Sequence, residues 1–201
     1  MKLKINNVRV SLLHETPLEK AVCKKLGVGK DCLGEIKIMR RAVDARKKDN
    51  VCLNYHVLAD VDINNKFAKK LLADKDVSQY KEEAAVPVEF GNLPISAPPI
   101  VIGAGPAGLL AALELAKYGY KPLLLERGKP VAQRVEDVKR FWKTGAFNPA
   151  SNVQFGEGGA GTFSDGKLNT GVNNPRIGWV LEQLVAAGAG EDILFDAKPH
   201  I

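Results

Sequence analysis

A glycine-rich turn between an apolar strand and a helix constrains the fold of this 201-residue chain more than any other feature. Residues 99–128 read PIVIGAGPAGLLAALELAKYGYKPLLLERG. The hexapeptide from Gly103 to Gly108 has the pattern GxGxxG, and it joins a predicted strand at 100–102 to a predicted helix at 107–118. A second strand at 122–126 completes a βαβ unit. This part of the chain is therefore predicted to be a Rossmann-type dinucleotide-binding fold.

Each glycine of the turn has a mechanical reason. Gly103 permits a tight turn, Gly105 lets a pyrophosphate approach the backbone, and Gly108 allows close packing of helix on strand. Pro106 and Ala107 complete the turn, and the helix that follows offers unpaired N–H groups and the positive end of its dipole to phosphate. These five residues are predicted to hold the cofactor.

An acidic residue ends the second strand. Glu126 lies 18 residues beyond Gly108, where a carboxylate can accept hydrogen bonds from both ribose hydroxyls. It would repel a 2′-phosphate, so we do not expect NADP at this site. FAD and NAD both present an adenosine pyrophosphate, and the local pattern does not separate them.

The N-terminal part alternates strands and helices. The predicted order is strand 3–12 with one slip of phase, helix 17–26, strands 36–42 and 51–61, helix 64–73 and strand 86–90. Thr16 is the expected N-cap of the first helix, with Pro17 at its first position and Gly27 at its end. The order βαββαβ is that of a ferredoxin-like domain.

A proline-rich stretch divides the chain. We predict a ferredoxin-like α+β domain at 1–90, a linker at 91–99 and an incomplete FAD-binding Rossmann domain at 100–201, an α/β fold overall. Beyond the βαβ unit we predict a helix at 131–142, a glycine-rich loop at 155–171, a helix that begins at Asn174-Pro175, and a strand at 193–201. Gly119 is expected to end the helix of the GxGxxG unit.

A second glycine-rich stretch carries a family resemblance. Residues 155–168 read FGEGGAGTFSDGKL and residues 42–48 read AVDARKK. With residues 99–128, they resemble a bacterial family of NAD(P)/FAD-dependent oxidoreductases, FAD-dependent dehydrogenases with a small N-terminal α/β domain. The resemblance covers the N-terminal part of such proteins, which are usually much longer. It implies an FAD-dependent oxidoreductase in which the second glycine loop approaches the pyrophosphate and flavin.

That role falls here on a run of small residues, whose exposed N–H groups suit an anion. The residues are Gly158, Gly159, Ala160, Gly161 and Thr162. Ser164 and Asp165 could cap the loop or reach the ribityl chain, and a glycine loop without a ligand is the alternative.

The resemblance also implies basic groups at the cofactor. Arg127 follows Glu126 directly, and Arg134 lies eight residues beyond it. Related flavoproteins often place an arginine there against the phosphates or adenosine, and an exposed arginine on an amphipathic helix is the alternative. Lys167 could stabilise a reduced flavin anion.

Other function classes lack their motifs. His14, His56 and His200 are isolated, so we expect no metal site. The sequence has no GxSxG elbow and no P-loop, and it identifies no catalytic acid or base. In flavoenzymes the cofactor carries the hydride chemistry, so this does not argue against an enzyme. The substrate and the electron donor or acceptor stay unidentified.

Composition bears on location and partners. Three scattered cysteines, no signal peptide and no long apolar run predict a cytoplasmic protein without a membrane partner. Residues 1–90 carry +5 of the net charge of +6, but acids and bases are interleaved, so we do not expect a nucleic-acid partner.

The alternatives to an FAD-dependent oxidoreductase are an NAD-dependent dehydrogenase and a non-catalytic nucleotide- or RNA-binding module. An RNA-binding sheet needs exposed aromatic residues, and only Tyr55 is available on its central strands.

Overall fold

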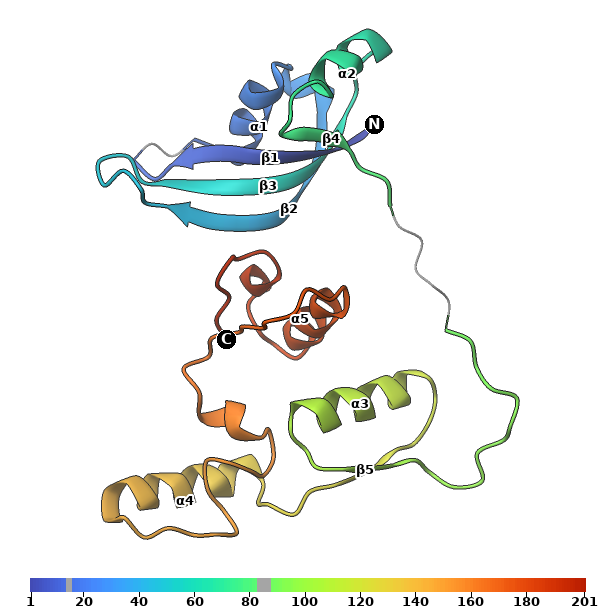
Figure 1. Cartoon of the computed structure of the whole chain (residues 1–201), viewed down its shortest axis with the longest axis vertical. Helices are drawn as coiled ribbons and strands as arrows, with labels where there is room; N and C mark the ends of the chain where they lie inside the picture. The colour runs from blue at the N-terminus through green and yellow to red at the C-terminus, as the bar shows by residue number, and fades with distance from the viewer. Residues whose placement is uncertain (14–15, 83–87) are drawn as a thin grey trace. The chain divides into compact units, whose positions relative to one another are not determined.

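A computed structural model of the chain describes residues 1–13, 16–82 and 88–201 (Figure 1). It divides into two compact units. Unit 1 comprises residues 1–87 and 168–201, and unit 2 comprises residues 88–167. Residues 168–201, which the sequence analysis placed with the Rossmann domain, thus pack with the N-terminal domain. The predicted boundaries at 90 and 100 stay a prediction.

The N-terminal part of unit 1 is a four-stranded antiparallel sheet with two helices. Its elements are β1 (Lys2–Ser11), α1 (Leu18–Leu26), the 3₁₀ turn η1 (Lys30–Cys32), β2 (Leu33–Asp44), β3 (Cys52–Val61), α2 (Asn65–Leu71) and β4 (Val77–Gln79). The strand order β2-β3-β1-β4 is that of the ferredoxin-like fold, which confirms the predicted class. Both helices cover one face of the sheet (Figure 1).

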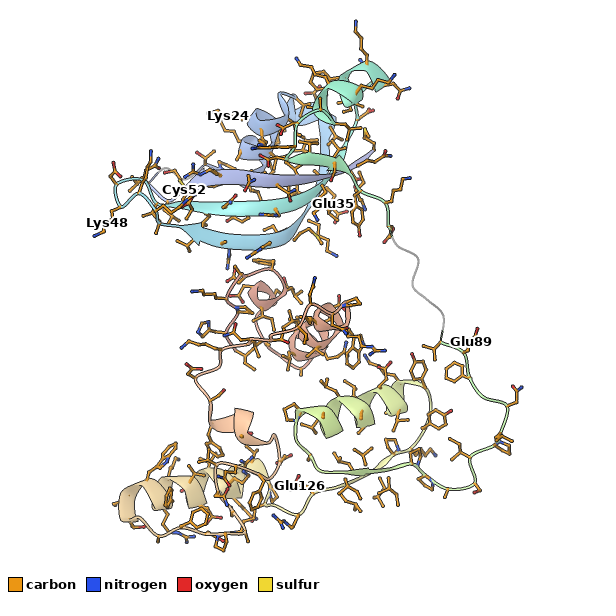
Figure 2. All side chains as sticks on the ribbon, in the orientation of Figure 1. Lys24, Glu35, Lys48, Cys52, Glu89 and Glu126 are labelled. Carbon is orange, nitrogen blue, oxygen red and sulfur yellow. The ribbon has the colours of Figure 1, made fainter. Side chains whose placement is uncertain are left out.

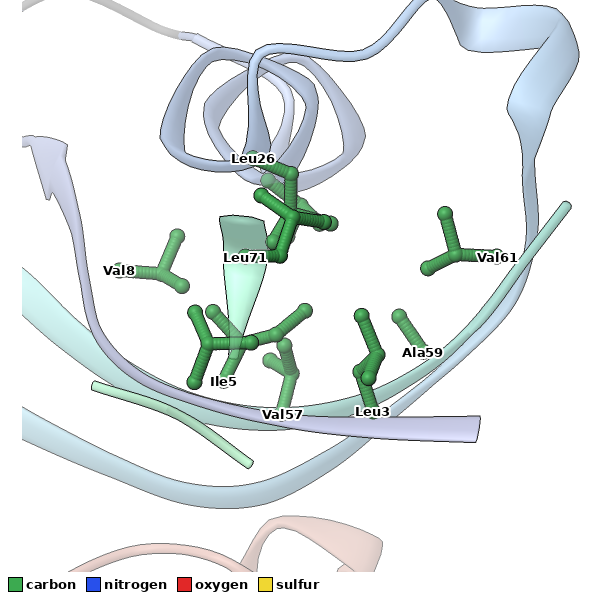
Figure 3. Packing of buried hydrophobic residues seen from close by; sticks show 10 residues of the cluster. Leu3, Ile5, Val8, Leu26, Val57, Ala59, Val61 and Leu71 are labelled. Carbon is green, nitrogen blue, oxygen red and sulfur yellow. The ribbon is translucent and has the colours of Figure 1, made fainter. Parts of the chain in front are cut away.

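The core of this domain lies between that face and the helices, as Figure 3 shows. Alternate residues of β1 and β3 meet apolar side chains of the helices and of β4. The buried set is Leu3, Ile5, Val8, Val22, Leu26, Val57, Ala59, Val61, Leu71 and Val77. The predicted slip of phase in β1 is a β-bulge between Ile5 and Val8, where Asn7 has a φ of 56°.

Two predictions for this domain are wrong. Pro17, not Thr16, is the N-cap residue of α1, and no side chain caps that helix. The last strand of the domain is Val77–Gln79, because Val77 is buried against β1. The strand was expected at 86–90, but residues 88–90 form no strand, and residues 86–87 lie outside the described part. Gly27 does end α1 in the left-handed conformation, as predicted.

The rest of unit 1 is α5 (Arg176–Ala186) and the 3₁₀ turn η3 (Glu191–Leu194). Asn174 caps α5, since its Oδ1 accepts a hydrogen bond of 2.9 Å from the amide of Arg176. The predicted strand at 193–201 is wrong: residues 193 and 194 belong to this turn, and Asp196 makes an isolated bridge with Arg41 of β2. The carbonyl of Asp192 accepts hydrogen bonds from the amides of Phe195 and Asp196, which closes the turn.

Unit 2 contains a parallel pair of short strands with α3 between them in sequence (Figure 1). Its elements are β5 (Ile100–Ile102), α3 (Pro106–Lys117), β6 (Leu123–Leu125), α4 (Val131–Thr144) and the 3₁₀ turn η2 (Ala160–Phe163). Gly119, with a φ of 84°, follows the end of α3 as predicted. The mixed α/β class is confirmed. Among the described residues, no helix combines the length and apolar character that crossing a membrane requires.

Candidate dinucleotide-binding site

The first glycine turn has the geometry that its sequence predicts. The amide of Gly103 donates to the carbonyl of Leu125 at 2.7 Å, and Gly103 has a φ of 99°. A Cβ on Gly108 would overlap the carbonyl oxygen of Gly103, so only glycine allows α3 to sit this close. A Cβ on Gly105 would meet nothing within 4 Å. The backbone of Gly105 therefore faces open space that a phosphate can fill.

The N-terminus of α3 borders that space. Gly105 is the N-cap residue, and Pro106 occupies the first helical position without an N–H to lose. The amides of Ala107 and Gly108 fall in the first turn of the helix, where no intrahelical acceptor exists for them. Together with the helix dipole they form a place for an anion.

Glu126, labelled in Figure 2, directly follows β6, and its side chain binds the glycine turn. Its Oε2 accepts from the amide of Ala104 at 2.6 Å, and its Oε1 accepts from the amide of Gly128 at 2.7 Å. The backbone hydrogen bonds of Gly128 and Ala104 lower the pKa of this carboxyl, against a smaller opposing effect of burial. The group is therefore ionised at neutral pH. A carboxylate has further lone pairs, which stay available to ribose hydroxyls.

The second glycine loop lies against the first. The amide of Gly158 donates to the carbonyl of Ala104 at 2.8 Å. A Cβ on Gly159 would lie 3.0 Å from Cδ of Pro106 and 3.4 Å from Cα of Gly105. Gly158 and Gly159 both have positive φ, at 82° and 67°. The structure thus brings the two loops together, although some fifty residues separate them in sequence.

Arg134, on α4, holds the second loop in place. This side chain is completely buried, and it donates to four backbone carbonyls from 152 to 159. The distances are 3.3 Å and 3.1 Å to Asn152, 3.2 Å to Val153, 2.5 Å to Glu157 and 3.0 Å to Gly159. Its guanidinium also lies 4.9 Å from the ring centroid of Phe163.

All five N–H donors of Arg134 are used in this way. The alternative expectation of an exposed arginine is wrong, because this side chain is buried. A contact of Arg134 with the cofactor phosphates or adenosine stays a prediction. Amphipathic spacing placed Arg134 on a helix, but it could not show that the buried face of α4 meets an irregular loop whose carbonyls need donors.

The remaining predicted residues are spread around the loop. Arg127 stacks on Phe155, with 4.7 Å between guanidinium carbon and ring centroid. Ser164 accepts a hydrogen bond from the amide of Gly166 at 3.2 Å, so it caps a turn. Lys167 pairs with Asp165 at 2.6 Å, and both side chains are more than half exposed.

Ala160, Gly161 and Thr162 belong to η2. The hydroxyl of Thr162 donates to the carbonyl of Glu157 at 3.3 Å and lies where a Cβ on Gly158 would be. A Cβ on Gly161 would meet nothing within 4 Å, so its backbone, like that of Gly105, faces open space.

Sequence reasoning missed three contributors to this site. Glu157 accepts a hydrogen bond of 2.6 Å from the amide of Val131 and so caps the N-terminus of α4. Gly128 and Gly156 lie back to back, since a Cβ on Gly128 would be 2.5 Å from Cα of Gly156. A glycine directly after Glu126-Arg127 was the one signal that pointed to such a close approach. In the part of the chain that the structure describes, His, Cys, Asp and Glu side chains form no group of three that could hold a metal ion.

Fold and geometry define the class of unit 2. It is a Rossmann-like dinucleotide-binding region of the kind that oxidoreductases carry. Residues 101–152 match the model of the NAD(P)-binding Rossmann-like domain. Residues 2–60 match a domain of unknown function, DUF8436.

One relative extends the similarity to the whole chain. The chain is 44% identical, over 208 residues, to an uncharacterized protein of Clostridium beijerinckii. The alignment covers all of this chain and 38% of that protein. The chain thus spans less than half the length of the curated relative that it matches.

Proposed function

We propose that unit 2 binds the ADP portion of FAD and that the chain is the FAD-binding portion of a flavin-dependent oxidoreductase. The observation that carries this proposal is the contact between the two glycine loops, Gly158 N–H to the Ala104 carbonyl at 2.8 Å. An adenosine pyrophosphate needs only the first loop and Glu126. A second loop of small residues beside the first extends the anion-binding surface toward a longer ligand, as the resemblance to FAD-dependent dehydrogenases implies.

The residues present fit such a ligand. Gly105 and Gly161 each face open space. Neither has a positive φ, so the backbone conformation does not require glycine there, and the open space itself is what a ligand can use. Ionised Glu126 suits ribose hydroxyls and disfavours a 2′-phosphate. A bound flavin supplies the hydride and electron transfer, while these residues bind and orient it.

Arg134 has an indirect role in this proposal. It contacts carbonyls of the second loop and not the open space, so it is a positioning residue. Arg127 directly follows Glu126, and Lys167 follows the second loop in sequence; both side chains are exposed. We assign them a weaker, electrostatic part in holding the pyrophosphate or the flavin.

One observation counts against the RNA-binding alternative. Tyr55 packs against the hydrophobic core of unit 1 and so does not offer a base-stacking platform on the open face of the sheet. We therefore propose a small-molecule substrate and no nucleic-acid partner. The thiols of Cys23, Cys32 and Cys52 are all free, which is compatible with the proposed cytoplasmic location.

The test is ligand binding to the purified chain, by absorbance and by titration with FAD and with NAD. Gly105→Val fills the open space at a φ of −76° that valine can adopt, so the loss of binding is not a folding effect. Gly171→Val is the matched control, since a Cβ there also meets nothing within 4 Å. We expect saturable FAD binding that Gly105→Val weakens at least tenfold and Gly171→Val leaves unchanged. Preferential binding of NAD, or binding of neither nucleotide by a folded chain, would refute the proposal.

A further inference from the structure

The outer edge of β2 is occupied by a distant part of the same chain. β2 is an edge strand, and such strands present unpaired N–H and C=O groups. The amide of Arg41 donates to the carbonyl of Phe195 at 2.7 Å, and the amide of Ala197 donates to the carbonyl of Arg41 at 2.9 Å. Asp196 thereby forms a parallel bridge with Arg41. Residues 195–197 add to the sheet as a minimal fifth strand.

The Arg41 side chain reinforces this pairing. Its Nε and Nη2 donate to the two carboxylate oxygens of Asp196 at 2.6 Å and 2.8 Å, which is the two-pronged geometry that only arginine provides. The guanidinium also lies 4.9 Å from the ring centroid of Phe195 and 4.0 Å from Asp192. The Arg41 and Asp196 side chains are 31% and 27% exposed, so water screens the pair only in part.

We propose that the N-terminal domain is a docking module, and that its β2 edge binds residues 192–197 of the same chain with Arg41 as the residue that selects them. Backbone pairing at a strand edge gives binding without sequence preference, and a charged fork supplies the preference. The partners are 155 residues apart, so no local turn explains their contact. The docked residues 192–197 lie on the C-terminal side of the second glycine loop in sequence. The inference does not depend on the nature of the bound nucleotide.

The experiment is amide hydrogen exchange on the whole 201-residue chain, read at Ala197. Arg41→Ala removes the fork from the sheet side, and Asp196→Asn removes the charge from the segment side without touching the sheet. Arg46→Ala is the matched control. Arg46 makes a similarly short two-pronged pair, at 2.8 Å and 2.7 Å, but its partner Asp44 is only two residues away in sequence. We expect exchange at Ala197 to accelerate about tenfold in the first two variants and to stay unchanged in the control, as for a half-screened ion pair with good geometry.

A charge swap makes the test reciprocal. Arg41→Asp combined with Asp196→Arg is expected to recover part of the protection that either change alone removes. Protection of the β1–β3 amides, such as that of Val57, shows in each variant that the sheet is intact. The proposal is overturned if Ala197 exchanges at the wild-type rate in both Arg41→Ala and Asp196→Asn, or if Arg46→Ala accelerates it equally.

Discussion

Gly108→Ala tests the packing of α3 on the glycine turn. The new Cβ would overlap the carbonyl oxygen of Gly103 and lie 3.4 Å from Cγ1 of Val101. Alanine in place of glycine inside a helix ordinarily stabilises by about 0.5–1 kcal/mol, while overpacking costs about 1–3 kcal/mol. The overlapping atom belongs to the backbone and cannot turn away. We therefore expect a net loss of about 1–2 kcal/mol in the free energy of unfolding of unit 2.

Gly178→Ala is the matched control. Both glycines are the third residue of their helix, but a Cβ on Gly178 would meet nothing within 4 Å. Here the helix propensity acts alone, so a gain of up to about 1 kcal/mol is expected in unit 1. The difference in sign between the two variants isolates the steric contact.

The two tryptophans of the chain allow each unit to be followed by itself. Trp142 lies in α4 of unit 2, and Trp179 lies in α5 of unit 1. Urea unfolding of a Trp179→Phe background reports unit 2 through Trp142 fluorescence, and a Trp142→Phe background reports unit 1. If Gly108→Ala proved as stable as its parent, or more stable, α3 would not sit against the turn and the assignment of Gly108 would fail.

Three further changes test other contacts. Arg134→Lys offers three donors in place of five and leaves buried carbonyls unpaired. The free energy of unfolding of unit 2, followed by Trp142 fluorescence, is therefore expected to fall by about 2–4 kcal/mol. Little change would mean that the guanidinium is not enclosed. The pKa of Glu126 is lowered in the folded state, so its stabilisation of the turn is complete above its ordinary value of 4.5 and is lost as the pH falls below that value toward the lowered pKa. Glu126→Gln should remove this acid dependence from the stability of unit 2, and an unchanged pH profile would contradict the assignment. Ile102 and Leu125 are exposed side chains on one face of the β5–β6 sheet. Replacing both, Ile102→Thr with Leu125→Thr, should reduce self-association, measured by light scattering, and the binding of hydrophobic dyes, measured by fluorescence. No change in either measurement would show that this face of the sheet is covered.

Local signals predicted most of the elements. Alternation along β1 and β3, the turn residues between β2 and β3, and the glycines after α1 and α3 each act within a few residues, so the sequence displays them directly. The bulge at Ile5–Val8 was visible for the same reason, as a break in alternation. The GxGxxG geometry followed because its three glycines answer to steric limits inside one βαβ unit.

The errors arose where distant contacts decide. β4 is only three residues long, and its place at 77–79 depends on pairing with Leu3–Ile5 rather than on its own pattern. The apolar run 193–195 was expected to be a strand, but the Asp192 carbonyl closes a turn there and Arg41 takes over the pairing. No local pattern announces that the positive charge of Arg41 and the negative charge of Asp196 meet across the chain. The same holds for Arg134, whose partners are backbone carbonyls and thus have no residue signature.

The two-stranded sheet of unit 2 presents one exposed apolar face. Val101 faces α3, because Cγ1 of this residue lies beside Gly108, and Leu124 pairs with it in register. Alternation then places Ile100, Ile102, Leu123 and Leu125 on the opposite face, where they are 46–85% exposed. Parallel sheets occur almost only with both faces covered, since their strands are apolar throughout. The first glycine loop lies at the carboxyl end of β5, so this exposed face borders the proposed nucleotide site. An apolar layer there would strengthen each electrostatic contact of Glu126 and of the α3 N-terminus by excluding water from them.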